Sequence, residues 1–542
     1  MNQKPISYDL TPMYENDWNG INGGATIEAG GATIEAGGTN NKQKIVNTVP
    51  EGQFCPTFPK VGGEPIASGG YGCVFKPALS CKSNPGKRAP GKITKLMSKK
   101  YAEREYNEIM RFQKIISSIP NYTHYFLLND FTLCEPAPLT NEDLNHFDKC
   151  RTLKKDGINE KNINHSLDKI MALTMPDGGI AVDDYIRKTT NYTDFITLNN
   201  TLIELLNKGI IPMNRKHIYH SDIKDSNVLV KVMEQNHSNN PELYTRLIDW
   251  GISVEYQPGD KFPYLWTNRP FQFNTPFSII LFTDLFVEKY TEFVQLNPKT
   301  NSINYKEDIG AFVMDYIYLW MKKRGPGHYK AINNIFYVLF SEELVSMPFS
   351  DKEKIIETNY TLVYIKNYLT EIIYHFSNNK GHFNMESYLN KVFIKLIDVW
   401  GFVSIYFCVL EELFEFKDTL SSNEKQLFDF LKKIVLTYLY NPCTKPISIL
   451  HLSKDLKHLN QFFGQEIKRN NNDTSHFLVV KSQSTKKSSV SKKKRFQTLM
   501  MVTKSTTIPK KSKTKSQPNK LVRSSLQTRK NNKYALSNKI IQ

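Results

Sequence analysis

The spacing of apolar residues divides the middle of the chain into two kinds of segment. Short strand-like apolar runs come first, and we predict strands over residues 72–79, 92–97, 169–175, 228–233 and 245–251. Longer segments with apolar residues at helical spacing follow, and we predict helices over residues 309–323, 362–376, 392–414 and 426–440. Strands followed by helices predict an α+β fold, with a small β-rich lobe ahead of a larger helical lobe.

The two ends of the chain lack this pattern. Residues 1–62 are polar and contain a direct repeat of GGATIEA, at Gly23–Ala29 and Gly30–Ala36. Two copies are too few to build a solenoid, so we interpret this segment as a disordered linker. After about Phe477, Lys, Ser, Thr and Gln become dominant, and such a composition cannot offset the entropy of ordering. We predict a basic disordered tail over residues 466–542. We therefore predict one folded domain over residues 63–465.

The net charge of +18 comes from the C-terminal segment. Residues 481–542 hold 18 of the 71 Lys and Arg residues and no Asp or Glu, which leaves 53 basic and 53 acidic residues in the rest of the chain. This basic tail is typical of solubilising segments, of polyanion or nucleic-acid contacts and of nuclear-import signals. Its Ser and Thr residues are also candidates for self-phosphorylation.

The cysteines and the apolar runs predict an intracellular, cytoplasmic protein with no membrane contact, and the basic tail leaves a nuclear location open. The seven cysteines are scattered and form no CxxC pair, which indicates neither a zinc site nor a disulfide framework. The first 50 residues hold no apolar core of a secretory signal. The most apolar charge-free run, Val399–Leu410, has only 12 residues and is too short to span a bilayer.

The stretch HSDIKDSN, from His220 to Asn227, contains the candidate catalytic residues. It places one His, two Asp, one Lys and one Asn within eight residues and then runs into the apolar Val228–Val230. The spacing His-x-Asp-x-x-x-x-Asn is a weak signal by itself. Its value depends on the motifs on either side.

Three further motifs surround this stretch. Upstream, the Gly-rich turn Ile66–Pro77 passes into a strand, and Gly69 and Gly72 have no Cβ to keep backbone amides away from phosphates. Lys95 lies in an apolar alternation, as a strand lysine would, and Asp249 follows an apolar pair and precedes a Trp-Gly pair. Between them, a helical pattern ended by Pro120 carries an acidic face with Glu103, Glu105 and Glu108.

The order of these motifs resembles the eukaryotic-type protein kinases over roughly residues 63–460. Residues 172–186 resemble the strand, hinge and helix that hold adenine in this family, residues 398–413 the helix under the catalytic loop, and residues 438–448 the closing motif. The Asn-, Lys-, Ile- and Tyr-rich composition and the insertions resemble the divergent serine/threonine kinases of large cytoplasmic DNA viruses. That origin would place the protein in the host cytoplasm or the virion.

The resemblance implies a two-lobed kinase fold. The N-lobe would cover about residues 63–176 and the C-lobe about 177–465, with a helical insertion over about 280–390. It further implies an ATP- and Mg²⁺-dependent serine/threonine kinase with a protein substrate. The ATP-binding loop would consist of Ile66, Ala67, Ser68, Gly69, Gly70, Tyr71, Gly72, Cys73 and Val74.

The resemblance also implies the roles of the remaining site residues. Lys95 would hold the ATP phosphates, and its carboxylate partner would be Glu105 or, as the alternative, Glu108. Asp222 would be the catalytic base and Lys224 would contact the γ-phosphate. Asn227 and Asp249 would hold Mg²⁺.

Several positions depart from the family pattern. Ala67 replaces the usual first glycine of the loop, and Trp250 replaces a phenylalanine after Asp249. Ser221 replaces an arginine that receives an activation-loop phosphate in many members, so we expect no need for phosphorylation over residues 252–275. Phe277 stands where a glutamate is usual, with Lys445 in place of its arginine partner.

Three alternatives to an active protein kinase remain open at this point. They are a catalytically inactive pseudokinase scaffold, a small-molecule kinase of related fold and a nucleic-acid-binding protein that acts through its tail. The role of about 120 residues before residue 398 is equally open, because they could form a docking surface or a structural buttress.

Overall fold

The computed structural model describes residues 63–68, 71–189, 191–233, 242–344, 346–441 and 444–470. The GGATIEA repeat and the basic tail lie outside these residues, and so do Gly69 and Gly70 of the Gly-rich loop. The predictions made for those parts of the chain therefore stay predictions.

The first part of the fold is a five-stranded antiparallel sheet. Its strands follow the order β1-β2-β3-β5-β4, and they are β1 (Glu64–Ser68), β2 (Gly72–Lys76), β3 (Lys92–Ser98), β4 (Thr132–Cys134) and β5 (Ile170–Pro176). Helix α1 (Lys99–Ile116) begins directly after β3, and α2 (Tyr122–Tyr125) follows it. Because Ile109, Phe112 and Ile116 recur at helical spacing, α1 buries one continuous face.

The connection between β4 and β5 packs against the sheet and is tied to it by one disulfide, and a second disulfide ties the connection between β2 and β3 to β4. It contains α3 (Asn141–Leu144) and α4 (Arg151–Lys155), and it forms a small core with β2 and β3. Cys73 on β2 bonds Cys150, and Cys81 bonds Cys134. The prediction that the cysteines form no disulfide framework was therefore wrong, since the fold joins thiols that lie 77 and 53 residues apart along the chain.

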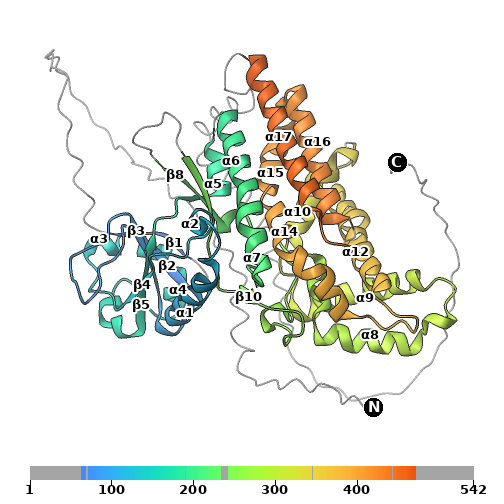
Figure 1. Ribbon diagram of the computed structural model, residues 1–542, viewed down its shortest axis with the longest axis horizontal. Helices are drawn as coiled ribbons and strands as arrows, with labels where there is room; N and C mark the ends of the chain where they lie inside the picture. Colours follow the sequence, from blue (N-terminus) through green and yellow to red (C-terminus); the bar gives the residue numbers. More distant parts are fainter. Residues whose placement is uncertain are drawn as a thin grey trace, which may run out of the picture. The chain divides into compact units, whose positions relative to one another are not determined.

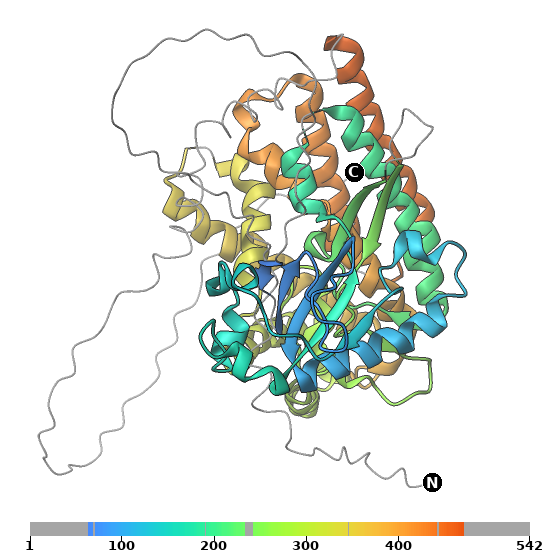
Figure 2. The same ribbon diagram turned by 90° about the vertical axis from the view of Figure 1, so that its left-hand side faces the viewer.

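The second part of the fold is helical, with short strands near its start. The strands are β6 (Ile180–Ala181), β7 (Ile218–Tyr219), β8 (Val228–Met233), β9 (Glu242–Leu247) and β10 (Val254–Glu255). The helices are α5 (Val182–Lys188), α6 (Tyr192–Glu204), α7 (Ile211–Arg215), α8 (Asp284–Leu296), α9 (Tyr305–Arg324), α10 (Tyr329–Phe340), α11 (Phe349–Ile355), α12 (Leu362–His375), α13 (Met385–Tyr388), α14 (Ile394–Ser404), α15 (Phe407–Glu415), α16 (Ser422–Val435) and α17 (Ile449–Asn470). Figures 1 and 2 show the sheet and this larger set of helices in different parts of the folded unit. The predicted α+β class is confirmed in this coarse form.

Helix α17 corrects the predicted end of the folded domain. It runs to Asn470, beyond the predicted boundary at residue 465. Leu452, Leu456, Leu459 and Phe463 are buried at helical spacing, and α17 packs along α6. Burial of this apolar face stabilises α17 as part of the folded domain.

The apolar centre of the helical part is the run from Met385 to Glu415. By length and composition this run is long enough to cross a membrane, and 89% of its most apolar window is buried. Such burial is typical of the core helix of a folded domain. Every residue of α14 within the run is buried except Lys395, so this helix is packed on all sides.

Candidate functional site

The loop from His220 to Asn227 connects β7 to β8 and is anchored from below by α14. The backbone N–H groups of His220 and Ser221 donate to the Asp398 carboxylate at 2.9 and 2.8 Å, and Asn214 Nδ2 donates to it at 2.7 Å. Burial raises the pKa of Asp398, although these donors and His220 oppose the rise. Asp398 therefore fixes the start of the loop by accepting backbone hydrogen bonds.

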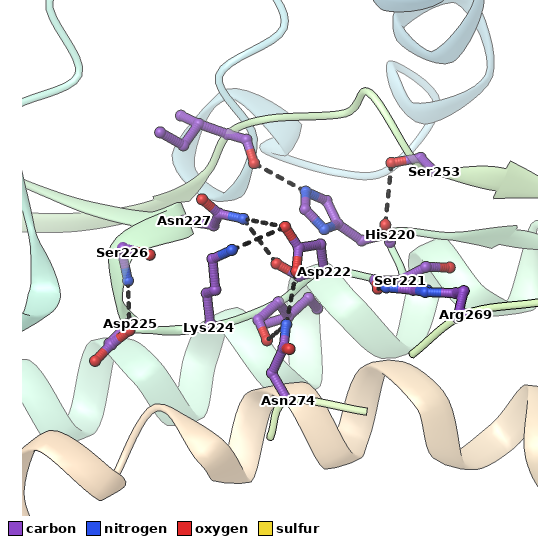
Figure 3. A network of polar contacts seen from close by, with 12 residues as sticks. His220, Ser221, Asp222, Lys224, Asp225, Ser226, Asn227, Ser253, Arg269 and Asn274 are labelled. Atoms are coloured by element: carbon purple, nitrogen blue, oxygen red, sulfur yellow. Dashed lines mark hydrogen bonds and ion pairs between the residues drawn. The ribbon is translucent and has the colours of Figure 1, made fainter. Parts of the chain in front are cut away.

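Three side chains surround the carboxylate of Asp222 (Figure 3). Its Oδ2 accepts from Lys224 Nζ at 3.0 Å and from Asn227 Nδ2 at 3.0 Å. Its Oδ1 accepts from Asn274 Nδ2 at 2.7 Å. Burial alone would raise the pKa of Asp222, but the Lys224 ammonium, the Asn274 hydrogen bond and the Arg269 charge outweigh burial and lower it. Asp222 is therefore an oriented carboxylate that is ionised at neutral pH.

Lys95 on β3 forms an ion pair with α1. Its Nζ donates to the two carboxylate oxygens of Glu105 at 2.9 and 2.7 Å, whereas Glu108 pairs with Arg104 at 3.2 Å. The structure thus selects Glu105 from the two candidates. Burial would lower the pKa of Lys95, but the carboxylates of Glu105 and Asp249 outweigh burial and raise it.

Asp249 comes close to the catalytic loop through the backbone around it. Ile248 N donates to Asn227 O at 3.0 Å, and Ile248 O lies 2.9 Å from His220 Nε2. Asp249 itself is exposed and has a positive φ of 64°. Its electrostatic interaction with Lys95 joins the sheet to the loop, so the side chains of Lys95, Asp222, Asn227 and Asp249 converge on one region.

The Gly-rich loop is a hairpin between β1 and β2. Ile66, Ala67 and Ser68 lie on β1, and Gly72, Cys73 and Val74 lie on β2, which Tyr71 precedes. A Cβ on Gly72 would lie 2.6 Å from Met97 Cγ and 2.7 Å from Leu96 O, so only glycine fits the close approach to β3. The side chain of Cys73 is buried in its disulfide with Cys150. The ATP-binding role predicted for Cys73 would therefore fall to its backbone, and it stays a prediction.

Trp250, which follows Asp249 in the chain, packs against three other rings. Its ring centroid lies 5.6 Å from that of Phe112 on α1, 5.8 Å from Phe126 and 5.0 Å from His220. The indole therefore links α1 to the catalytic loop by apolar and edge-to-face contacts. Trp250 can fill this position although it is larger than the phenylalanine of the resembled family.

Phe277, which stands where a glutamate is usual in the resembled family, packs among aromatic rings. Its ring stacks on Tyr440 at 5.5 Å and contacts Trp400 at 5.3 Å. Lys445 is exposed. An apolar ring stack thus encloses Phe277 at the place where the resembled family has a buried ion pair.

Three residues near the site were missed by the sequence analysis. Trp266, Arg269 and Asn274 all contact residues 221–223 of the catalytic loop. Arg269 and Asn274 are 2% and 1% exposed. The sequence offered no distinct signal for these residues, because polar and aromatic residues are mixed throughout this segment. Only the burial of Arg269 and Asn274 in the fold distinguishes them.

The oxygen atoms at the site fit a hard divalent cation. Asn227 directs its nitrogen to Asp222, and Figure 3 shows its oxygen pointing away from that carboxylate. Asp249 adds an exposed carboxylate. Within the described ranges, no cluster of three or more His, Cys, Asp or Glu side chains could hold a metal. A cation held here would complete its coordination with phosphate oxygens and water, as is usual for Mg²⁺.

Comparisons with known proteins place few limits on the function. No protein-family model matches the chain, and no curated protein matches it. Among solved structures, a crystal structure of a Plasmodium kinase domain is 14% identical and has a TM-score of 0.25, and the match covers 58% of this chain and 92% of that one. At this level of likeness, only the geometry of the site can carry a functional conclusion.

Proposed function

We propose that this chain is an ATP- and Mg²⁺-dependent serine/threonine protein kinase with a two-lobed fold. The observation that carries the proposal is the convergence of Lys95, Asp222, Asn227 and Asp249 from separate parts of the chain. Lys95 is already paired with Glu105 at 2.7 Å. Phosphoryl transfer needs positioning and charge stabilisation more than covalent work by the protein, and these groups supply both.

Each side chain has a defined task in the proposed reaction. Lys95 would hold the α- and β-phosphates, and Glu105 keeps its ammonium oriented. Asn227 and Asp249 would hold Mg²⁺, which when bound supplies positive charge to the phosphates. Asp222 would accept a hydrogen bond from the acceptor hydroxyl and take its proton while the γ-phosphorus bonds the hydroxyl oxygen and releases ADP.

Lys224 supports a serine or threonine acceptor. Its Nζ lies 3.0 Å from Asp222 Oδ2, next to the point where the acceptor hydroxyl would sit. A lysine here would stabilise the charge that develops on the transferred phosphoryl group. A lysine at this position is also the usual choice of the serine/threonine kinases within the family that the chain resembles.

The test compares the wild-type protein with Asp222→Asn. With labelled ATP, Mg²⁺ and a basic protein substrate, we expect Asp222→Asn to lower transfer about 10²–10⁴-fold and to leave ATP·Mg²⁺ binding unchanged. The matched control is Asp168→Asn, which alters an exposed aspartate before β5. Phospho-amino-acid analysis of the product should show phosphoserine or phosphothreonine.

Other outcomes would select the alternatives. Nucleotide binding by the wild type without any transfer would favour the pseudokinase scaffold. Transfer to small hydroxyl compounds but to no protein would favour a small-molecule kinase. No binding of ATP at millimolar concentration with Mg²⁺ would refute the proposed nucleotide site.

A further inference from the structure

Side chains of the segment from Trp266 to Thr275 donate hydrogen bonds to the catalytic loop. Trp266 Nε1 donates to Ser221 Oγ at 2.8 Å, and Arg269 Nη1 and Nη2 donate to Ser221 O at 3.2 and 3.1 Å. Asn274 Nδ2 donates to Asp222 Oδ1 at 2.7 Å and to Ile223 O at 3.2 Å. Each residue of the loop from 221 to 223 thus accepts a hydrogen bond from this segment.

On the side away from the catalytic loop, which we call its outer side, the backbone carbonyl groups of the same segment accept hydrogen bonds from α9 and from the loop that follows α9. Trp320 Nε1 donates to Arg269 O at 3.2 Å, and Arg324 Nε donates to Asn268 O at 3.0 Å. His328 N donates to Phe271 O at 2.7 Å. The adjacent Gly327 has a φ of +55°, and a Cβ there would lie 2.3 Å from Phe271 O. The approach is therefore so close that only glycine fits.

Arg269 carries a positive charge into the interior beneath the catalytic loop. Its side chain is buried, and within the described part of the chain it forms no salt bridge. Burial lowers the pKa of Arg269 to about 10, opposed by the charges of Asp222 and Asp398, so the guanidinium stays protonated at neutral pH. A buried charge without a function would be costly, and this one lies beside the candidate catalytic base.

The hydroxyl groups of the segment from 252 to 275 offer little surface for phosphorylation. Its hydroxyl-bearing residues are Ser253, Tyr256, Tyr264, Thr267 and Thr275. Ser253, Tyr256 and Thr275 are buried. Thr267 is half-buried, and its hydroxyl donates to Pro263 O at 3.4 Å. Among these five residues, only Tyr264 is exposed.

We propose that Arg269 is a positioning residue that keeps the catalytic loop and Asp222 in place. The inserted helices hold the segment from Trp266 to Thr275 on its outer side. No phosphate group on residues 252–275 is then needed to order the catalytic loop. This inference rests on the proposed kinase function. It assigns a structural buttress role to the insertion, because α9 and the loop before α10 supply the outer bonds. It also explains how Ser221 can stand where the resembled family has a phosphate-binding arginine.

The first test replaces the guanidinium. We expect Arg269→Met to lower kcat about 10²-fold, as small displacements of catalytic groups do, with the KM for ATP unchanged. Arg269→Lys should restore part of kcat, because the charge is kept and the two-pronged contact is lost.

The pH profile separates positioning from a loss of folded protein. Within the described residues, the positive charges of Lys224 and Arg269 lower the pKa of Asp222. The His328 imidazole also interacts with Asp222, and burial lowers its own pKa. Loss of the guanidinium charge in Arg269→Met should therefore move the acid limb of kcat/KM to higher pH. A smaller folded fraction alone would scale the profile without moving that limb.

A second variant tests the clamp without touching Arg269. Arg324→Met removes the bond to Asn268 O, whereas Lys323→Met alters the neighbouring exposed lysine. We expect Arg324→Met to lower kcat several-fold and to speed protease cleavage between residues 252 and 275. Lys323→Met should change neither.

The outcomes separate this inference from the proposed function. Full activity of Tyr264→Phe/Thr267→Val, and of phosphatase-treated wild type, would support it. Loss of activity in either case, or an unchanged kcat and pH profile in Arg269→Met, would overturn it while the kinase function stands. No transfer by the wild type would overturn both.

Discussion

Single residues near the catalytic loop have their properties set by one or two neighbours. Asp222 keeps a low pKa in a buried place because Lys224, Asn274 and Arg269 face it. Lys95 depends in the same way on Glu105 and Asp249. A substitution that removes one of these partners should therefore change the rate of the reaction while the rest of the fold stays unchanged.

The two acidic residues of α1 provide a matched pair for this test. Glu105→Gln removes the charge that orients Lys95, so we expect kcat/KM for ATP to fall about 10–100-fold, the loss of a charge-assisted contact worth about 1.5–3 kcal/mol. Glu108→Gln removes only a half-exposed pair with Arg104 and should change kcat/KM less than about two-fold. Equal losses in steady-state kinetics would contradict the assignment of Glu105.

Asp225 gives a prediction about pH and stability. Burial, with a further contribution from Asp183, raises the pKa of Asp225 to about 6. Its favourable contribution is therefore complete below about pH 4, the unfolded pKa, and is lost as the pH rises through 6. We expect Asp225→Asn to stabilise the protein at pH 7.5 by about 1–3 kcal/mol, at about 1.4 kcal/mol per pKa unit, and to have no effect below pH 4.

Thermal or urea unfolding of wild type and Asp225→Asn at both pH values would measure this difference. Asp168→Asn, at an exposed site, serves as the control and should show no gain that depends on pH. A gain in Asp225→Asn of the same size at pH 4 and pH 7.5 would show that the carboxyl charge is not its cause.

At the scale of elements, disulfides and packing hold connections that have little regular structure of their own. Cys150 lies just before α4, and Cys81 lies in the long connection between β2 and β3. Each is tied to a strand of the sheet, with Cα–Cα distances of 5.2 and 5.8 Å. The two disulfides thus hold these connections against the sheet.

Peptide mapping without reduction should recover the pairs Cys73–Cys150 and Cys81–Cys134. Cys408, which is free and buried, should be alkylated only after unfolding. Reduction should destabilise the protein by about 2–4 kcal/mol for each bridge, because the unfolded chain gains entropy. Cys150→Ser should reproduce the effect of losing one bridge, and unchanged stability after full reduction would contradict this account.

At the scale of the whole molecule, the net charge of +18 comes from the C-terminal segment 481–542. The tail from 481 to 542 lies outside the described residues, whereas Lys95, Glu105, Asp222, Asn227 and Asp249 lie within them. We propose that the tail contacts a polyanion or nucleic acid, since its 18 basic residues can neutralise phosphates without reading sequence.

Deletion of residues 481–542 tests this proposal directly. We expect the truncated protein to keep its kcat on a short peptide substrate and to lose retention on a nucleic-acid column at low salt. Wild-type retention should fall steeply as salt rises. A variant with Gln at the basic positions of 486–495 should lie between the two, and equal retention of all three proteins would remove the proposed contact.

Periodicity and composition were sufficient to predict the α+β class and the positions of several strands and helices. The order of local motifs, by its resemblance to the protein kinases, implied the residues that converge at the site. These signals are local: apolar spacing reports which face of an element is buried, and glycine or proline restricts the backbone where it stands. The order of Lys95, Asp222, Asn227 and Asp249 along the chain could therefore be read before any contact was known.

Only the tertiary structure decided which distant residues meet. The choice of Glu105 over Glu108, the pairing of four cysteines, the stack of Phe277 on Tyr440 and the clamp around Arg269 depend on how helices rotate and pack on the sheet. A rotation of α1 by one position would exchange its partners, because residues three or four apart share a face while adjacent ones do not. Such contacts follow from the close packing of the whole core, to which segments hundreds of residues apart contribute.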